Sequence, residues 1–186
     1  MKLFLKTCKP AVICFAVMTV LCGVLYTAAI TGIAQSVFPR QANGSIIIVT
    51  MKDGTRAKYG SALIAQEFTQ PEYLIGRPTG TTNLSPTGEK QKKLLQERID
   101  WWHRFDPNNQ ADIPADLLTA SGSGVDPYIS PAAAAYQVQR IAAARNMQAD
   151  DIERIIQNYT SKRWLGFIGE PGVNILKVNL ALDGLL

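Results

Sequence analysis

The sequence predicts a single N-terminal transmembrane helix followed by one extracytoplasmic α/β (α+β) domain. Residues Pro10 to Pro39 contain no Asp, Glu, Lys, Arg or His, and a bilayer core needs only about 20 apolar residues of helix. The remainder mixes strand-like and helix-like patterns and is long enough to fold on one hydrophobic core. We therefore expect residues 1-9 to form a cytoplasmic tail, residues 10-38 the transmembrane helix and residues 39-186 the outer domain.

The apolar run favours a retained anchor over the alternative, a cleaved secretory signal. The run is roughly twice as long as the apolar region of a signal peptide. Residues 26–29 (Tyr-Thr-Ala-Ala) also make a poor cleavage site, because more apolar residues follow them. Lys2, Lys6 and Lys9 precede the run, whereas its other flank is less basic. This asymmetry predicts a cytoplasmic N-terminus and an extracytoplasmic C-terminal domain.

Small and hydroxyl side chains recur every four residues within the run, at Thr19, Gly23, Thr27 and Thr31. Such a stripe lets a second helix approach closely in a membrane, so we treat it as a candidate helix contact. The alternative is that the threonine hydroxyls hydrogen-bond to their own backbone. The pattern by itself supports both interpretations equally.

The net charge of +4 is concentrated at the N-terminus. Three of the 19 basic residues precede Pro10 and none of the 15 acidic residues does, so the outer domain is nearly neutral. Lys90, Lys92 and Lys93 share one expected helix, which is typical of a solvated face, and we expect no nucleic-acid partner. The anchor and its basic flank contain all three cysteines: Cys8, Cys14 and Cys22. The domain therefore has neither a disulfide nor a thiolate metal site.

The outer domain begins with a predicted β-hairpin. Residues Ser45–Met51 are apolar and β-branched, Asp53-Gly54 is a turn signal, and residues 55–63 can return as a second strand. Residues 76–87 are rich in Gly, Pro, Thr and Ser and are expected to form a loop. A small sheet is therefore expected directly after the membrane span.

Three helices and a final strand are expected in the rest of the domain. Ser85-Pro86 supplies an N-cap and a first-turn proline for a helix that ends at Phe105, with Trp102 on its apolar face. Ser130-Pro131 repeats this signal for a helix that Asn146 ends, and residues 149–159 form the next, so the two make a helical hairpin. Residues Val173–Val178 have the composition of a strand.

The residues do not indicate a catalytic centre or a metal site. The only histidine, His103, lies between aromatic residues and is more typical of a packing or surface position than of a general base. Ser121-Gly122-Ser123-Gly124 lacks the first glycine of a nucleophile elbow. Its backbone amides could cradle an anion, but a tight connection with positive φ at the glycines is the simpler interpretation.

The segment LLTASGSGVDPYISPAAAAYQVQRIAAAR closely resembles the C-subunit family of the Kdp-type potassium-transporting ATPases. The resemblance covers essentially the whole chain, including the anchor. Ala65, Gly172 and the loop Thr79–Thr87 depart from the family pattern, which affects loop details. Further matching motifs are Gln41–Ser45, Gly60–Phe68, Arg77-Pro78, Gly169–Pro171 and Val178–Asp183.

The resemblance implies a set of structural or interface residues. They are Gln41, Asn43, Gly44, Ser61, Gln66, Arg77, Pro78, Ser121, Gly122, Ser123, Asp126, Pro127, Gln137, Arg140, Arg145, Glu170, Asn174 and Asn179.

The resemblance also implies a function and partners. The family is a non-catalytic accessory subunit in the plasma (inner) membrane, assembled with a potassium-conducting channel-like subunit, a P-type ATPase subunit and a small accessory subunit. It is described as a catalytic chaperone that raises the ATP affinity of the pump subunit. ATP, Mg and potassium then belong to the assembled complex. An outward-facing domain cannot touch a cytoplasmic nucleotide, so any effect on ATP must be a coupling between distant sites.

Two alternatives to the accessory subunit remain open. The first is a free-standing, membrane-tethered binding domain with a ligand pocket. The second is an enzyme whose only candidate groups are His103 and Ser123.

Overall fold

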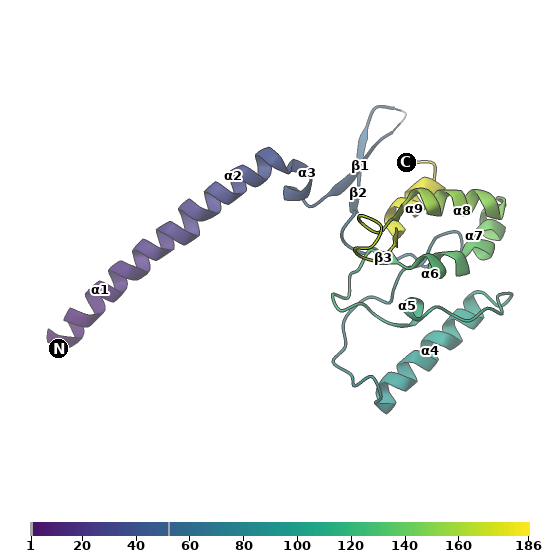
Figure 1. Ribbon diagram of the computed structural model, residues 1–186, viewed down its shortest axis with the longest axis horizontal. Coiled ribbons are helices and arrows are strands. Elements are labelled where there is room, and N and C mark those ends of the chain that lie inside the picture. Colours follow the sequence, from purple (N-terminus) through teal and green to yellow (C-terminus); the bar gives the residue numbers. More distant parts are fainter. Residues whose placement is uncertain (1, 52) are drawn as a thin grey trace. The chain divides into compact units, whose positions relative to one another are not determined.

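The computed structural model describes residues 2–51 and 53–186 of the chain (Figure 1). The chain divides into two compact units, residues 1–46 and residues 47–186, which we describe separately. Residue 1 of the expected tail lies outside the described residues.

The N-terminal unit is one long apolar helix with a short helical turn after it. Helix α1 covers Lys2–Met18, the π-helical segment η1 covers Thr19–Tyr26, α2 covers Thr27–Val37 and α3 covers Pro39–Ala42. Residues Lys6–Val37 are long and apolar enough to cross a membrane, and none of the apolar window is buried within the protein. A helix that is apolar all round and uncovered is suited to a lipid environment.

The C-terminal unit, named the outer unit because it follows the apolar helix along the chain, begins with the expected hairpin. Strand β1 covers Ile46–Thr50, and β2 covers Arg56–Ser61. In the turn, Gly54 has a φ of 82°, and the Asp53 carboxylate accepts hydrogen bonds from both the backbone N–H and the hydroxyl of Thr55, at 2.9 and 2.6 Å. These bonds lower the pKa of Asp53, the hydroxyl bond having the larger effect.

The next helix starts later than the Ser85-Pro86 signal predicted. Helix α4 covers Glu89–Phe105, and its N-cap is Gly88. The carbonyl of Ser85 instead accepts the N–H of Gly88 at 3.0 Å, which closes a turn before the helix. The expected core position of Trp102 is confirmed, because it is 2% exposed, whereas its neighbour Trp101 is 38% exposed and stacks on Phe105.

A short helix and a small antiparallel sheet, which the sequence patterns did not predict, follow α4. Helix α5 covers Ala115–Leu118. Strands β3 (Tyr128–Ile129) and β4 (Thr160–Ser161) flank β5 (Gly172–Asn174) in the order β3-β5-β4. The register pairs Ile129 and Thr160 with Val173.

The helical hairpin is confirmed, but its first arm is broken. Helices α6 (Pro131–Tyr136) and α7 (Val138–Arg145) meet at Gln137, and α8 covers Ala149–Asn158. The Ser130 hydroxyl accepts the N–H of Ala133 at 3.0 Å, as the cap signal predicted. Asn146 ends α7 in the left-handed conformation, with a φ of 54°.

The strand predicted over Val173–Val178 is wrong beyond Asn174. Helix α9 covers Ile175–Leu182, and the Asn174 side chain caps it by accepting the N–H of Lys177 at 3.1 Å. A short run of apolar residues fits a buried helix as well as a buried strand, and the cap decides between them here. The outer unit is therefore of the expected α+β class.

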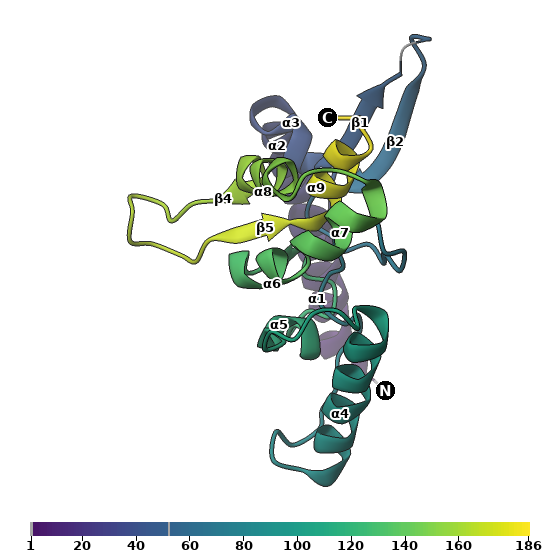
Figure 2. The ribbon, with the colours of Figure 1, turned by 90° about the vertical axis from the view of Figure 1, so that its right-hand side faces the viewer.

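One core joins helices α4 to α9 with strands β3 and β5. Its fully buried members include Leu74, Leu117, Ile141, Ile152, Val173 and Val178. Two views turned by 90° place α4 at one end of the outer unit, well away from α8 and α9 (Figures 1 and 2).

Candidate functional site

An irregular segment, residues 71–77, crosses the core and is held there by side chains from later helices. We call it the clamped segment. The Asn179 side chain accepts the N–H of Leu74 at 2.8 Å and donates to the carbonyl of Leu74 at 3.0 Å. The Gln137 side chain does the same at Ile75, at 2.9 and 3.0 Å. Each primary amide thus replaces the peptide group of a neighbouring strand.

Two arginines act with Gln137 and Asn179, and we call these four side chains the clamp. Arg140 donates to the carbonyls of Pro71 and Tyr73 and to the Gln137 amide oxygen, and Arg145 donates to the carbonyl of Glu72 at 2.7 Å. Five consecutive carbonyls, residues 71–75, therefore accept side-chain donors.

The arginines are also fixed by their surroundings. The Arg140 guanidinium lies 4.9 Å from the centre of the Phe105 ring, and burial lowers the pKa of Arg140 to about 10, although Asp106 opposes that shift. Arg145 forms a 2.7 Å ion pair with Asp183 and also donates to the carbonyl of Leu182.

The clamp is stable only as a complete set. Gln137 and Asn179 are 0% and 1% exposed, and a buried amide costs free energy unless its donors and acceptors are satisfied. Gln137 also donates to the carbonyl of Ala133 at 3.1 Å. The break between α6 and α7 therefore occurs at Gln137, whose side chain binds the clamped segment.

A second run of backbone carbonyls, residues 117–120, also accepts hydrogen bonds from side chains. The Trp102 indole donates to Leu117, Arg98 donates to Leu118 at 2.6 Å, and Arg77 donates to Thr119 and Ala120. Arg77 is the last residue of the clamped segment, so it links the two runs of carbonyls.

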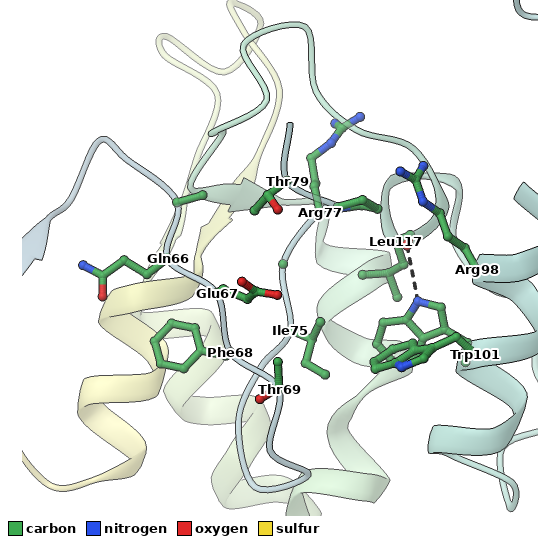
Figure 3. Close-up of a pocket in the computed structure, with 14 residues that line it drawn as sticks. Gln66, Glu67, Phe68, Thr69, Ile75, Arg77, Thr79, Arg98, Trp101 and Leu117 are labelled. Atoms are coloured by element: carbon green, nitrogen blue, oxygen red, sulfur yellow. Dashed lines mark hydrogen bonds between the residues drawn. The ribbon is translucent and has the colours of Figure 1, made fainter. Parts of the chain in front are cut away.

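A cleft lies between the clamped segment and α4 (Figure 3). About 700 Å³ of space not filled by atoms lies within the open cleft, and part of it is continuous with solvent. The Phe68 and Trp101 rings and the Glu67 carboxylate lie along it, together with Pro78. The Arg77 and Arg98 guanidinium groups at the cleft each donate to backbone carbonyls of residues 118–120.

The Ser121–Pro127 loop is a tight connection that uses its own polar groups. Ser121 Oγ accepts the N–H of Gly124 at 2.9 Å. Gly124 has a φ of 71°, and a Cβ there would lie 2.7 Å from the carbonyl carbon of Gly80. The expected positive φ is confirmed for Gly124 but is wrong for Gly122, whose φ is not positive.

The two ends of this loop are held by other motif residues. The Asp126 carboxylate accepts the N–H of Tyr128 at 3.0 Å, and the Pro127 carbonyl accepts the N–H of Ile175 at 3.1 Å. Ser123 Oγ lies 3.3 Å from Ser121 Oγ. The loop thus connects the cleft to the start of α9.

Three further motif side chains fasten the end of the first hairpin. The Asn174 amide donates to the carbonyl of Ala62 at 2.9 Å, and Gln66 donates to the carbonyl of Tyr59 at 2.8 Å. Ser61 Oγ accepts the N–H of Leu63 at 3.1 Å. The end of strand β2 is therefore bonded to Gln66, and the residue after it to Asn174, the N-cap of α9.

The remaining motif residues lie away from this network. Asn43 exchanges hydrogen bonds with Gln35 and donates to the Pro39 carbonyl within the N-terminal unit. Gln41 and Gly44 are joined by a 3.0 Å backbone bond in the same unit. Glu170 is on the surface, 3.6 Å from Arg163.

One position of the threonine stripe follows the backbone-bonding interpretation, and the helix contact stays a prediction. Thr19 and Gly23 lie in η1, and a Cβ on Gly23 would meet only the Thr19 methyl, at 3.9 Å. Thr27 donates its hydroxyl to the carbonyl of Cys22 at 3.1 Å, so this threonine does bond its own helix. Thr31 is exposed, as are the other three positions.

The groups considered for catalysis do not form a constellation. His103 is exposed beside Pro107 and Gln110 on the far side of α4's buried face, and Ser123 is exposed within its own loop. Among the described residues no three His, Cys, Asp or Glu side chains are grouped to hold a metal ion.

Sequence reasoning missed two residues of the network. Asp116 accepts the N–H of Ser130 at 2.6 Å and its hydroxyl at 3.2 Å, and Arg98 holds Leu118. No local pattern marks them, because their partners are 14 and 20 residues away.

Comparison with known proteins gives one consistent result. Residues 8–184 match the sequence model of the family described as K+-transporting ATPase, c chain. Proteins named potassium-transporting ATPase KdpC subunit from Listeria monocytogenes serovar 1/2a and Listeria innocua serovar 6a are each 55% identical over 188 residues, which cover 100% of this chain and 99% of theirs. A protein of the same name from Clostridium botulinum is 45% identical and is covered completely. The chain therefore belongs to the family of c chains of K+-transporting ATPases.

Proposed function

We propose that the chain is a non-catalytic accessory subunit that stabilises an ATP-driven, high-affinity potassium uptake complex. Its partners are a potassium-conducting channel-like subunit, a P-type ATPase subunit and a small accessory subunit. The helix anchors it in the lipid of the plasma (inner) membrane, with the N-terminus cytoplasmic and the domain outside. A nearly neutral domain suits this place, since a strongly positive one would repel potassium.

One observation carries the proposal. Four buried or half-buried polar side chains, Gln137, Arg140, Arg145 and Asn179, are bonded to the domain's own backbone. Such bonds fix the shape of the domain around the clamped segment. A rigid domain on a single apolar helix is what an assembly subunit requires.

The proposal is tested by purification from cells starved of potassium. The tagged full chain, expressed at its native level, should co-purify with a P-type ATPase in mild detergent. Recovery of the chain alone would contradict the proposal and favour the free-standing binding domain, for which the cleft beside Trp101 would be the ligand site.

The stripe provides a matched pair of variants for the same experiment. Gly23→Leu should weaken co-purification without preventing membrane insertion, because it blocks close approach of a second helix. Gly32→Leu makes the same change away from the stripe, where a Cβ would meet nothing within 4 Å, and should have little effect. Equal co-purification of the two variants would count against the stripe.

The proposed effect on ATP, with its Mg, is indirect. If the domain lies outside, it raises the ATP affinity of the pump subunit by a coupling carried through packed helices. A photoreactive ATP analogue should then label the pump subunit and not this chain, while removal of the chain raises the ATP concentration needed for half-maximal turnover. Labelling of this chain would contradict the outward orientation.

A further inference from the structure

The β4–β5 hairpin ends in an exposed group of large apolar side chains that the proposed function does not use. Trp164, Leu165, Phe167 and Ile168 are 68, 67, 73 and 44% exposed. We call residues 163–168 the apolar tip. Figure 2 shows this hairpin projecting from the body of the outer unit. Soluble surfaces seldom gather large apolar groups in this way without a contact to cover them.

The apolar tip has an ordered backbone. Trp164 and Ile168 exchange two hydrogen bonds, at 2.8 and 2.9 Å, and the N–H of Gly166 donates to the carbonyl of Arg163 at 3.2 Å. The N–H of Phe167 donates to Trp164 at 3.3 Å. These bonds satisfy four N–H groups of the tip internally, which lowers the cost in hydrogen bonds of entering a water-poor environment.

The composition of the apolar tip suits the boundary between lipid headgroups and acyl chains. Trp and Phe are favoured there, and the long side chains of Lys162 and Arg163 can remain in the headgroup layer while the tip is buried. A protein partner fits less well, because a stable protein interface engages roughly 20–30 residues a side and this projection offers four large side chains.

The bilayer is also within reach. The candidate membrane span ends at Val37, and the chain from there to Ile47 extends at most about 35 Å. The base of the hairpin is tied to the same end of the domain, since Asn174 donates to the carbonyl of Ala62, just after the strand that pairs with β1. A tether this short keeps the tip at a high effective concentration near the membrane.

We propose that the apolar tip inserts into the interfacial layer of the bilayer that anchors the chain, as a second, reversible membrane contact. The inference rests on the proposed membrane anchorage and not on the identity of the partner subunits. It assigns to residues 163–168 a lipid ligand rather than a protein one.

The test places a spin label at the tip of the full-length chain. Phe167→Cys is labelled in a background in which the native cysteines are replaced by serine, and the chain is reconstituted into vesicles of phosphatidylcholine with a minor fraction of phosphatidylglycerol. Asn108→Cys, on an exposed loop after α4, is the control. We expect the Phe167 label to collide mainly with oxygen, which concentrates in lipid, and the Asn108 label mainly with a water-soluble nickel chelate.

Two outcomes would overturn the proposal. Nickel access at Phe167 equal to that at Asn108 would place the tip in water. In the assembled complex, shielding of the Phe167 label from both reagents would indicate a protein contact instead. Resistance of the chain to alkaline extraction is measured first, so that a failed anchor is distinguished from a tip that stays out of the bilayer.

The unlabelled protein provides an independent measurement. Brominated lipids should quench part of the tryptophan emission of the native chain. Trp164→Phe should remove most of that part, because Trp102 is buried in the domain core and Trp101 stacks on Phe105 in the cleft. Unchanged quenching in Trp164→Phe would contradict insertion of the tip.

Discussion

The clamped segment and the apolar tip are both irregular loops of one domain, yet they are held in opposite ways. The clamped segment is bonded by Gln137, Arg140, Arg145 and Asn179, which come from helices far along the chain. The backbone hydrogen bonds of the apolar tip join residues of the tip to one another, and its large side chains are exposed. The difference indicates that the first loop is part of the folded core, whereas the second is available to a surface outside the protein.

The largest effect is expected when Gln137 is replaced and the peptide groups of Ile75 lose both of their hydrogen bonds to it. Gln137→Leu leaves the N–H and the carbonyl of Ile75 buried without their partner and should lower the free energy of unfolding by about 3 kcal/mol. Gln139→Leu changes an exposed neighbour and serves as control. Denaturant unfolding of the full chain in micelles measures both variants, and equal stability would refute the clamp.

A smaller loss is expected where the Ser121–Pro127 loop meets the loop before α4. Gly124→Ala introduces a Cβ close to Gly80 and forces a side chain into positive φ, which should cost about 2 kcal/mol. Gly122→Ala, at a site with open space, should leave the free energy of unfolding nearly unchanged. A similar cost for both changes would mean that the contact with Gly80 is unimportant.

The turn between β1 and β2 is, like the apolar tip, bonded by nearby residues. It should have a weaker effect on stability, and this effect depends on pH. The pKa of Asp53 is lowered, so its contribution is complete above its unfolded value and is lost as the pH falls through the folded one. Between about pH 5 and about pH 3, the native chain should lose slightly more stability than Asp53→Asn. Parallel pH curves for the two proteins would contradict this assignment.

The smallest effect is expected at the apolar tip. Phe167→Ser removes a side chain that is 73% exposed, so the free energy of unfolding should change by less than about 0.5 kcal/mol. The same change should weaken membrane contact of the tip, as oxygen accessibility of a label at Ile168 would report. A large loss of stability would show that the tip packs against the domain after all.

Local signals predicted the elements that are determined locally. The Asp53-Gly54 turn, the Ser130 cap and the end of α7 at Asn146 each depend on residues within four positions, and all three are confirmed. The Ser85-Pro86 cap and the strand beyond Asn174 were wrong, because the same short patterns are compatible with a turn and with a buried helix.

The clamp could not be predicted in the same way. Its bonds join residues 62 and 105 positions apart, and a Gln or Asn in a sequence carries no mark of a distant peptide group. The family resemblance selected Gln137, Arg140, Arg145 and Asn179, but the role of each became visible only when the fold brought the clamped segment between the helices.

The clamp should slow the exchange of two buried amide hydrogens with solvent. Leu74 and Ile75 lie outside any helix or strand, yet their amides are buried and bonded to side chains that belong to the core. Their hydrogens should therefore exchange with solvent deuterium as slowly as those of α9, and only when the whole outer unit opens. Proteases cleave flexible, exposed backbone, so we expect limited proteolysis to cut the folded domain outside the clamped segment.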